Sequence, residues 1–418
     1  MQEKIITLAS PAFFLLIFVE YVVGVLRRRN TYRINDAINS LSLGVLSQVS
    51  GVFMQLVRIG IYAWTVEHVA LFTLSADSIW VWMSALLLYD FCYYWLHRMG
   101  HEVNVLWAAH VVHHQSEQYN LSTALRQTSS GALLGWIFYL PMALLGYPVE
   151  VFVVVALIDL LYQFWVHTEQ IGKLGWFDRV FVSPSNHRVH HAVNDIYLDK
   201  NYGGILIVWD RLFGTFIEER DDEKIVYGTR SPLRSWNPLW ANLEVYKAVW
   251  LDAWRATRWR DKLRIWFARP GWRPDDVTRK WPSVPFDITR PMYDPAASRA
   301  LMLYCALQFL IVLQVTTHFL LEYATMSFTE RAGYALWLGG GLWIVGGLLE
   351  GRASHVALEA IRLIATVAAV LLSGSWFGDI QLPTWAQLAL AGFAAASLLA
   401  LWLAFKRSLS VHGYFSHQ

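Results

Sequence analysis

The sequence is short of charge and of cysteine, and both shortages narrow what the protein can be. Only 16% of its 418 residues are charged, whereas a soluble protein carries about a quarter. The two cysteines, Cys92 and Cys305, lie inside apolar runs, so neither a disulfide framework nor a thiolate metal site can be built from them. The net charge of +2, without a basic block, gives no sign of a nucleic-acid partner.

Long apolar runs account for the low charge. A helix needs about 20 apolar residues to span a bilayer. The first run is followed by Arg27 to Arg29, whereas a signal peptide carries its positive charge before the apolar core, so we expect an anchor. The fourth run is short and contains Pro141, so it is a candidate for dipping into the membrane without crossing. The predicted spans are 6–26, 38–64, 79–96, 131–147, 149–166, 300–321, 333–349, 354–374 and 383–405.

These runs predict an all-α, polytopic membrane protein with a helical bundle and a histidine-rich di-metal domain. We divide the chain into N-terminal spans (1–78), a histidine-rich domain with a polar part (79–298) and C-terminal spans (299–418).

Basic residues at the ends of the spans predict the orientation. Arg27 to Arg29 and Arg33 follow the first span, and Lys406 and Arg407 follow the last, whereas the loops on the other side hold only Arg331. Nine crossings then place the N-terminus outside and the C-terminus inside. We therefore expect the histidine-rich segments on the cytoplasmic side.

One stretch of the polar region, Trp240 to Phe267, alternates tryptophan with arginine and lysine. An ordinary helix packed on its own domain would explain it. In a membrane protein we favour an interfacial helix, with tryptophan at headgroup depth and basic residues toward lipid phosphates.

Nine of the fourteen histidines lie between residues 97 and 191. Residues at i, i+3 and i+4 share one face of a helix, so each cluster could aim its imidazoles at a common point. Isolated histidines (His68, His318, His355, His412 and His417) are expected to be ordinary amphipathic residues. The clustered ones are His97 and His101 in "HRMGH", His110, His113 and His114 in "HVVHH", and His187, His190 and His191 in "HRVHH", with His167 alone in "FWVHT".

So many imidazoles are best explained by metal, because neutral imidazole is the commonest metal ligand. Eight or nine histidines exceed the needs of one zinc, so two metals are expected. Two iron ions, each with about five or six ligands and positions open for oxygen, use the set more fully than a copper pair. The spacing alone does not decide between iron and zinc.

Three carboxylates accompany the histidines. Asp90 and Asp159 precede His97 and His167 by about two helical turns, inside apolar runs where an ionisable group is costly. We expect both to support ligand histidines through hydrogen bonds, with salt bridges or helix caps as the alternative. Glu102 directly follows His101 and is a candidate ligand or proton carrier.

HxxxH, HxxHH and HxxHH in this order resemble the fatty acid hydroxylase and sterol desaturase superfamily of membrane di-iron enzymes. Within it, residues 101–127, 160–175 and 183–216 resemble the alkylglycerol monooxygenase family nearly residue by residue. One departure is Asn186, where that family has a further histidine; if that histidine binds metal there, His167 gains importance here.

The resemblance implies a cytoplasm-facing di-iron site held by the eight histidines of the three boxes, with Glu102 required. It also implies oxygen activation, with tetrahydrobiopterin or another reductant as electron donor. A lipid carbon next to an ether oxygen would be hydroxylated, and the product would collapse to a fatty aldehyde and a glycerol moiety. From the residues we add His167 as a ninth ligand or a direct partner of one.

Three other functions stay open. A hydroxylase or desaturase of fatty acyl, sterol, carotenoid or amino-lipid substrates would take its electrons from a small redox protein. A zinc hydrolase would work without oxygen. A metal transporter would need polar residues stepping through several spans, and the late spans have few ionisable residues.

Overall fold

The computed structural model describes the backbone of residues 2–295 and 297–415 and the side chains of 9–295 and 297–406. The side chains of Arg407, His412 and His417 therefore lie outside the described residues. The chain forms two compact units, each described here by itself. The first unit contains residues 1–32, 53–233 and 242–291, and the second contains residues 33–52, 234–241 and 292–418. The three-part division along the sequence stays a prediction.

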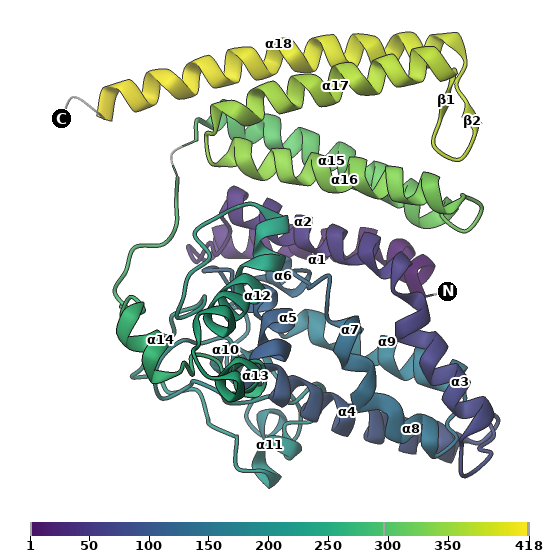
Figure 1. The fold of residues 1–418 in the computed structure, drawn as a ribbon, viewed down its shortest axis with the longest axis vertical. Helices are drawn as coiled ribbons and strands as arrows, with labels where there is room; N and C mark the ends of the chain where they lie inside the picture. Colours follow the sequence, from purple (N-terminus) through teal and green to yellow (C-terminus); the bar gives the residue numbers. More distant parts are fainter. Residues whose placement is uncertain (1, 296, 416–418) are drawn as a thin grey trace. The chain divides into compact units, whose positions relative to one another are not determined.

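The first unit is helical and contains the histidine-rich segments (Figure 1). α12 begins in the second unit and continues in the first. The elements are α1 (Gln2–Leu26), η1 (Leu56–Gly60), α3 (Ile61–His68), α4 (Ile79–Glu102), α5 (Asn104–His114), α6 (Leu121–Ala124), α7 (Ala132–Gly135), η2 (Trp136–Tyr139), α8 (Leu140–Leu144), α9 (Val149–Trp165), η3 (Phe177–Arg179), α10 (Pro184–His190), α11 (Val208–Leu212), α12 (Pro238–Arg255), α13 (Trp259–Phe267) and α14 (Asp275–Lys280).

Aromatic packing of α3 on α9, and of α4 on η2, fixes the helix that carries the first two histidines. Tyr62 stacks on Phe152 with ring centroids 4.1 Å apart, and Tyr89 stacks on Tyr139 at 4.7 Å. Buried rings of this size dominate core energetics. α4 ends where Val103 adopts an extended conformation, and α5 starts at the next residue, so the two histidine-bearing helices are joined by a single residue.

Two features begin α10, the other helix with a histidine box. Ser183 accepts a hydrogen bond from the backbone N–H of Asn186, and Pro184 occupies the first turn, where its missing N–H has no intrahelical partner to lose. The helix is only seven residues long, and His191 is its C-terminal cap.

The second unit is a bundle of long helices. α15 packs against α16 and α18, and α17 packs against α16 and α18. A capping box formed by Ser327 and Glu330 starts α16, and Gly374, at φ 71°, ends α17 in the left-handed conformation that glycine adopts without strain. Its elements are α2 (Ile34–Phe53), α15 (Arg299–Glu322), α16 (Phe328–Leu349), α17 (Ala353–Ser373), β1 (Ser375–Trp376), β2 (Ile380–Gln381) and α18 (Thr384–Phe415).

Six of the described helices are long and apolar enough to cross a membrane, or seven if the bent pair 34–53 and 56–68 counts as one span. The six are Ala9–Leu26, Ile79–Glu102, Arg299–Glu322, Phe328–Leu349, Ala353–Ser373 and Thr384–Lys406. This corrects the nine spans expected from hydropathy. The apolar segment around Pro141 is a broken helix, Ala132–Leu144, and α9 has 17 residues, because apolar runs can also supply helices that are too short to span.

Candidate metal centre

The nine clustered histidines come together in the first unit. They lie on the end of α4, on α5, on α10 with its cap, and just after α9. Their ring nitrogens fall into two groups, and within each group one nitrogen per residue lies within 4.8 Å of all the others. The five-histidine group is His97, His101, His110, His114 and His190; the four-histidine group is His113, His167, His187 and His191.

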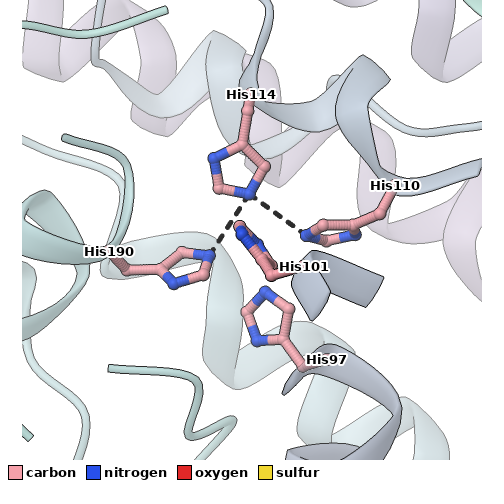
Figure 2. A group of neighbouring side chains, drawn as sticks. All are labelled: His97, His101, His110, His114 and His190. Atoms are coloured by element: carbon pink, nitrogen blue, oxygen red, sulfur yellow. Dashed lines mark hydrogen bonds between the residues drawn. The ribbon is translucent and has the colours of Figure 1, made fainter. Parts of the chain in front are cut away.

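In the five-histidine group the rings converge on one point (Figure 2). Nε2 of His114 lies 3.1 Å from Nε2 of His110 and 3.2 Å from Nε2 of His190. Among the described residues, Nε2 of His97 and Nε2 of His101 are buried and have no hydrogen-bond partner. These nitrogens therefore face one another and no other polar group.

The four-histidine group has the same character. Nε2 of His167 lies 3.1 Å from Nε2 of His113 and 3.0 Å from Nε2 of His187, and Nε2 of His187 lies 3.2 Å from Nε2 of His191. All four residues are buried. The structure thus brings His167, which belongs to no sequence cluster, into contact with two histidines of the boxes.

Each HxxHH box contributes to both groups, which corrects the expectation of one common point per cluster. His110 and His114 of α5 belong to the five-histidine group, whereas His113 belongs to the other. In the second box His187 and His191 belong to the four-histidine group and His190 to the five-histidine group. The physical reason is that i and i+4 lie nearly above one another on a helix, while i+3 and i+4 are about 100° apart around it.

Backbone carbonyls fix the orientation of four rings. Nδ1 of His97 lies 2.7 Å from the oxygen of Tyr202, and Nδ1 of His113 lies 2.9 Å from that of Arg126. Nδ1 of His167 pairs with the oxygen of Gln163 at 2.7 Å, and Nδ1 of His190 with that of Lys200 at 3.0 Å. A carbonyl only accepts, so Nδ1 carries the hydrogen, and a neutral ring then has a bare lone pair on Nε2.

Burial keeps these rings neutral. It lowers the pKa of His113 to about 4, and it lowers the pKa of His114 and of His187 well below the usual value. Neutral imidazole is the form that binds metal. The ligand atoms are therefore available at neutral pH without loss of a proton.

The distances fit metal ions. His113 and His167 both donate from Nδ1, so the two Nε2 atoms that are 3.1 Å apart turn lone pairs toward each other. That contact is repulsive unless a cation lies between them. Two nitrogens bound at right angles to one ion, with bonds of about 2.1 Å, would be about 3.0 Å apart. Both groups therefore fit one ion each.

The two aspartates reach the histidines through other groups. The carboxylate of Asp90 accepts from the backbone N–H of Ile205 at 2.7 Å and from the indole of Trp209 at 2.8 Å. Asp159 accepts from the side chain of Gln163 at 2.6 Å, and the carbonyl of Gln163 contacts His167. Their support of ligand histidines stays a prediction, and the observed route passes through the backbone.

Asp210, which the sequence analysis did not single out, has a more direct position. It is fully buried and accepts from the backbone N–H of Tyr202 and of Gly203, both at 2.7 Å, and from the hydroxyl of Thr215 at 2.7 Å. It thereby fixes the peptide whose carbonyl contacts His97. Asp210 lies in the segment "WDRLFGTF", which contains no histidine. The sequence therefore gives little sign that this carboxylate helps to orient a ligand histidine.

Glu102 closes the end of α4. Its carboxylate pairs with Nε of Arg98 at 2.9 Å and with Arg269 at 3.3 Å. Asp199, a second carboxylate at this side, lies 3.9 Å from Nδ1 of His101. Glu102 is thus beside the five-histidine group and held by two arginines, and its role in the reaction stays a prediction.

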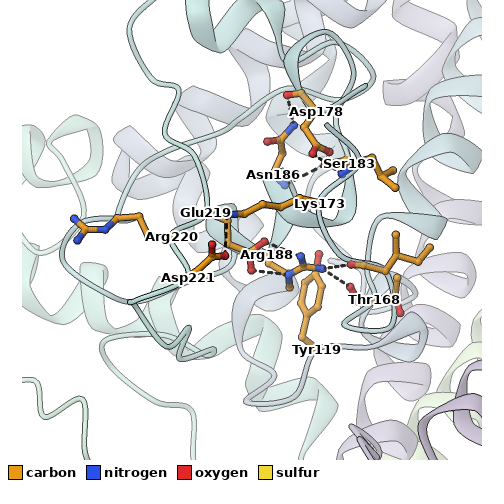
Figure 3. A network of polar contacts seen from close by, with 12 residues as sticks. Tyr119, Thr168, Lys173, Asp178, Ser183, Asn186, Arg188, Glu219, Arg220 and Asp221 are labelled. Atoms are coloured by element: carbon orange, nitrogen blue, oxygen red, sulfur yellow. Dashed lines mark hydrogen bonds and ion pairs between the residues drawn. The ribbon is translucent and has the colours of Figure 1, made fainter. Parts of the chain in front are cut away.

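Arg188 and Asn186 of α10 take part in a network of polar contacts (Figure 3). The buried Arg188 makes a bidentate pair with Glu219 at 2.6 and 2.9 Å and donates to the carbonyl of Thr168, next to His167, at 3.0 Å. Asn186 donates to the carbonyls of Asp178 and Phe181 at 3.0 and 3.1 Å. Position 186 is therefore structural in this chain, whereas Arg188 holds His167 against α10.

The described isolated histidines belong to neither group and make local contacts. Nδ1 of His68 contacts the carbonyl of Trp64, Nδ1 of His318 contacts the hydroxyl of Tyr334, and Nδ1 of His355 contacts the hydroxyl of Ser354. His355 is buried in the second unit. These contacts are local, as expected of ordinary histidines.

Comparison with known proteins places this geometry in a family. Residues 82–215 match the family model described as fatty acid hydroxylase. The chain is 38% identical over 368 residues to alkylglycerol monooxygenase from Homo sapiens, covering 85% of this chain and 80% of that protein. It is 38% identical over 369 residues to the enzyme of that name from Danio rerio, covering 86% and 81%. No solved structure matches the chain.

A more distant relative is an ornithine lipid hydroxylase from Rhizobium tropici, 32% identical over 135 residues, or 31% of this chain and 40% of that protein. The long matches extend well beyond the histidine boxes. Together with the six helices able to cross a membrane, they establish an integral membrane protein and an oxidoreductase. The chain therefore belongs to the alkylglycerol monooxygenase family and carries its two histidine groups in or next to a fatty acid hydroxylase domain.

Proposed function

We propose that this enzyme inserts oxygen from O2 into the C–H bond next to the ether oxygen of an alkylglycerol lipid. The hydroxylated carbon is then a hemiacetal, which collapses to a fatty aldehyde and a glycerol moiety. One oxygen atom enters the lipid and the other leaves as water, with two electrons and two protons supplied from outside. The names of the two long-matching relatives support this substrate class.

The proposal rests on one observation: the structure contains two groups of histidines, and within each group the ring nitrogens converge. The five-histidine group and the four-histidine group would each hold one iron ion. Iron with six coordination positions would keep one free for a small molecule in the five-histidine group and two in the four-histidine group. Bound there, two iron ions supply the redox chemistry that O2 activation requires.

The protein's own contribution is to hold neutral imidazoles in place. The carbonyls of Tyr202 and Gln163 fix the tautomers of His97 and His167, so no proton has to leave when an ion binds. Burial of both groups excludes bulk water, which protects reactive species from side reactions. Glu102, held by Arg98 and Arg269 beside the five-histidine group, would carry a proton or serve as a metal ligand.

Two further points belong to the proposal. Tetrahydrobiopterin or another reductant, delivered directly or through a redox partner, would supply the electrons. The histidine groups would face the cytoplasm, as the distribution of arginine and lysine around the spans predicts when the bent pair 34–53 and 56–68 crosses once and makes seven crossings. The orientation can be tested separately, by protease protection of tags placed at the two ends of the chain.

The test uses purified full-length protein in nanodiscs with an alkylglycerol lipid, O2 and a reduced pterin. We expect an oxygen-dependent fatty aldehyde, captured as a hydrazone, and two irons per chain. Equal product under nitrogen, or activity that persists with stoichiometric zinc in place of iron, would exclude this oxygenase. Protein purified without iron and reloaded with ferrous iron serves as the matched control.

A second candidate is hydroxylation of an amino lipid, which the match to the ornithine lipid hydroxylase favours. In the same assay, ornithine lipid would then gain one oxygen and ether lipid would release no aldehyde. Mass spectrometry of both lipids incubated in parallel distinguishes the two candidates.

A further inference from the structure

An exposed apolar ridge runs along α13. Trp259, Leu263 and Phe267 are 77%, 66% and 73% exposed, and their spacing of four residues puts them on one face of the helix. Ile265, on the opposite face, is 1% exposed and packs with Val249 of α12. The helix is therefore seated on the first unit by one face and presents large apolar side chains on the other.

Basic side chains border this ridge. Arg258, Arg260 and Arg264 are exposed, and Arg264 lies over the ring of Trp272. From 254 to 273 the sequence has seven arginine or lysine residues and one acidic residue. A ridge that combines tryptophan, aliphatic groups and exposed arginines is complementary to an anionic lipid surface, where apolar groups enter the acyl boundary and cations meet phosphates.

The helix is also tied to the metal centre. The side chain of Asn104, the first residue of α5, donates to the carbonyl of Ile265 at 2.8 Å, and the backbone N–H of Asn104 donates to the carbonyl of Ala268 at 2.9 Å. Arg269 pairs with Glu102 at the end of α4. The end of α13 thus contacts both helices that carry the first histidines.

We propose that α13 lies in the headgroup layer of an anionic phospholipid leaflet, with the ridge of Trp259, Leu263 and Phe267 inserted. In Figure 1, α4 runs across the view while α13 is seen close to end-on, so α13 lies crosswise to a helix able to span the membrane. A crosswise helix at the end of a span is oriented along the membrane plane. The proposal does not depend on the lipid substrate or on the reaction.

Seating α13 in lipid has a consequence for the site. Because Asn104 joins α13 to the start of α5, the depth of α13 sets the depth of the helix that bears His110 and His114. Anionic lipid would therefore hold the histidine groups close to the leaflet from which a lipid substrate enters.

The experiment measures the depth of position 263 in the full chain. A Leu263→Cys variant, on a background with Cys92→Ala and Cys305→Ala, carries a nitroxide label in nanodiscs of phosphatidylcholine with or without phosphatidylglycerol. Relaxation of the nitroxide by O2 indicates that the label lies in lipid, and relaxation by a water-soluble nickel chelate indicates that it lies in water. Val284→Cys, at a 91% exposed position outside α13, is the matched control.

We expect the label at 263 to be relaxed mainly by O2, more strongly with phosphatidylglycerol, and the label at 284 mainly by nickel. Arg258→Gln with Arg260→Gln and Arg264→Gln should remove the effect of phosphatidylglycerol, whereas Arg220→Gln, at an exposed site elsewhere, should leave it unchanged. A label at 263 as open to nickel as that at 284 overturns the proposal. So does a label shielded from both reagents, which indicates a protein partner or a second copy, and so does equal depth in both lipid mixtures.

Discussion

In the second unit the polar side chains around the buried Glu359 satisfy one another, whereas in the first unit converging ring nitrogens of the histidine groups do not. Glu359 accepts from the hydroxyl of Tyr304 at 2.9 Å and from Arg362 at 2.7 and 2.8 Å. Arg362 also donates to Gln308 at 3.0 Å, and Gln308 donates to Ser397 at 3.3 Å. In the histidine groups, by contrast, the lone pairs on Nε2 of His113 and Nε2 of His167 face each other.

The difference distinguishes buried polar side chains that stabilise the fold from buried polar side chains that bind a ligand. A closed set of polar partners inside a helical bundle stabilises packing and needs no ligand. A set of converging lone pairs is stable only with a cation. An ionisable residue in a span usually suggests function, but here the partners of Glu359 argue for a structural role, in agreement with the expectation that the late spans do not conduct ions.

Removal of one histidine from either group should have the largest effect. His167→Ala and His190→Ala should each lose iron and activity, because each change removes a buried ligand. The fall in activity should exceed the about 100-fold that is typical when a residue supporting a ligand is removed. Iron analysis and turnover of purified protein measure both. His355→Ala, which removes a buried ring from the second unit, should keep iron and turnover. Full iron content and turnover in His167→Ala would mean that eight histidines suffice.

Breaking the closed set of the second unit should cost stability and leave the metal centre intact. Glu359→Ala leaves Arg362 buried without its carboxylate, which typically costs about 3–5 kcal/mol. Thermal unfolding in nanodiscs should show a lower midpoint, while folded protein retains two irons. Glu330→Ala, which removes an exposed helix cap, is the control and should cost about 1 kcal/mol. A loss of iron from folded Glu359→Ala protein would contradict the division between the two units.

Asp210→Asn should weaken the five-histidine group selectively. The change replaces one of the two carboxylate oxygens that accept from the backbone around Tyr202, whose carbonyl orients His97. Loss of a contact that orients a ligand typically lowers metal affinity by about 10–100-fold. Competition with a chelator measures the affinity of each ion. The matched control is Asp222→Asn, whose partner Arg220 is exposed. Unchanged affinity for both ions would show that Asp210 does not position His97.

The smallest effect is expected from Asn186→His, which restores the histidine that the family resemblance leads one to expect. The side chain of Asn186 bonds the carbonyls of Asp178 and Phe181, so the change should cost about 1–2 kcal/mol through lost hydrogen bonds. Iron should stay at two per chain and turnover should be nearly normal. A third metal, or tighter binding of the first two, would show that position 186 reaches the centre.

Much of the site could be predicted from sequence, because helical spacing places His97 with His101, and His110 with His114, on common faces. The division of each HxxHH box between two groups could not, since it depends on how α5 and α10 face each other across the centre. The sequence could not show which backbone carbonyls orient the rings, because every residue has a carbonyl. Hydropathy overcounted the spans because it does not distinguish a short broken helix, such as 132–144, from a crossing.

The shared boxes have a consequence for how the enzyme acquires its metals. His113 and His114 are neighbours on one helical turn, and so are His190 and His191, yet each pair serves both groups. An ion in one group immobilises α5 and α10 and so reduces the conformational entropy still to be lost when the second ion binds. Loading should therefore be cooperative, with chains holding a single ion scarce at every stage of a titration.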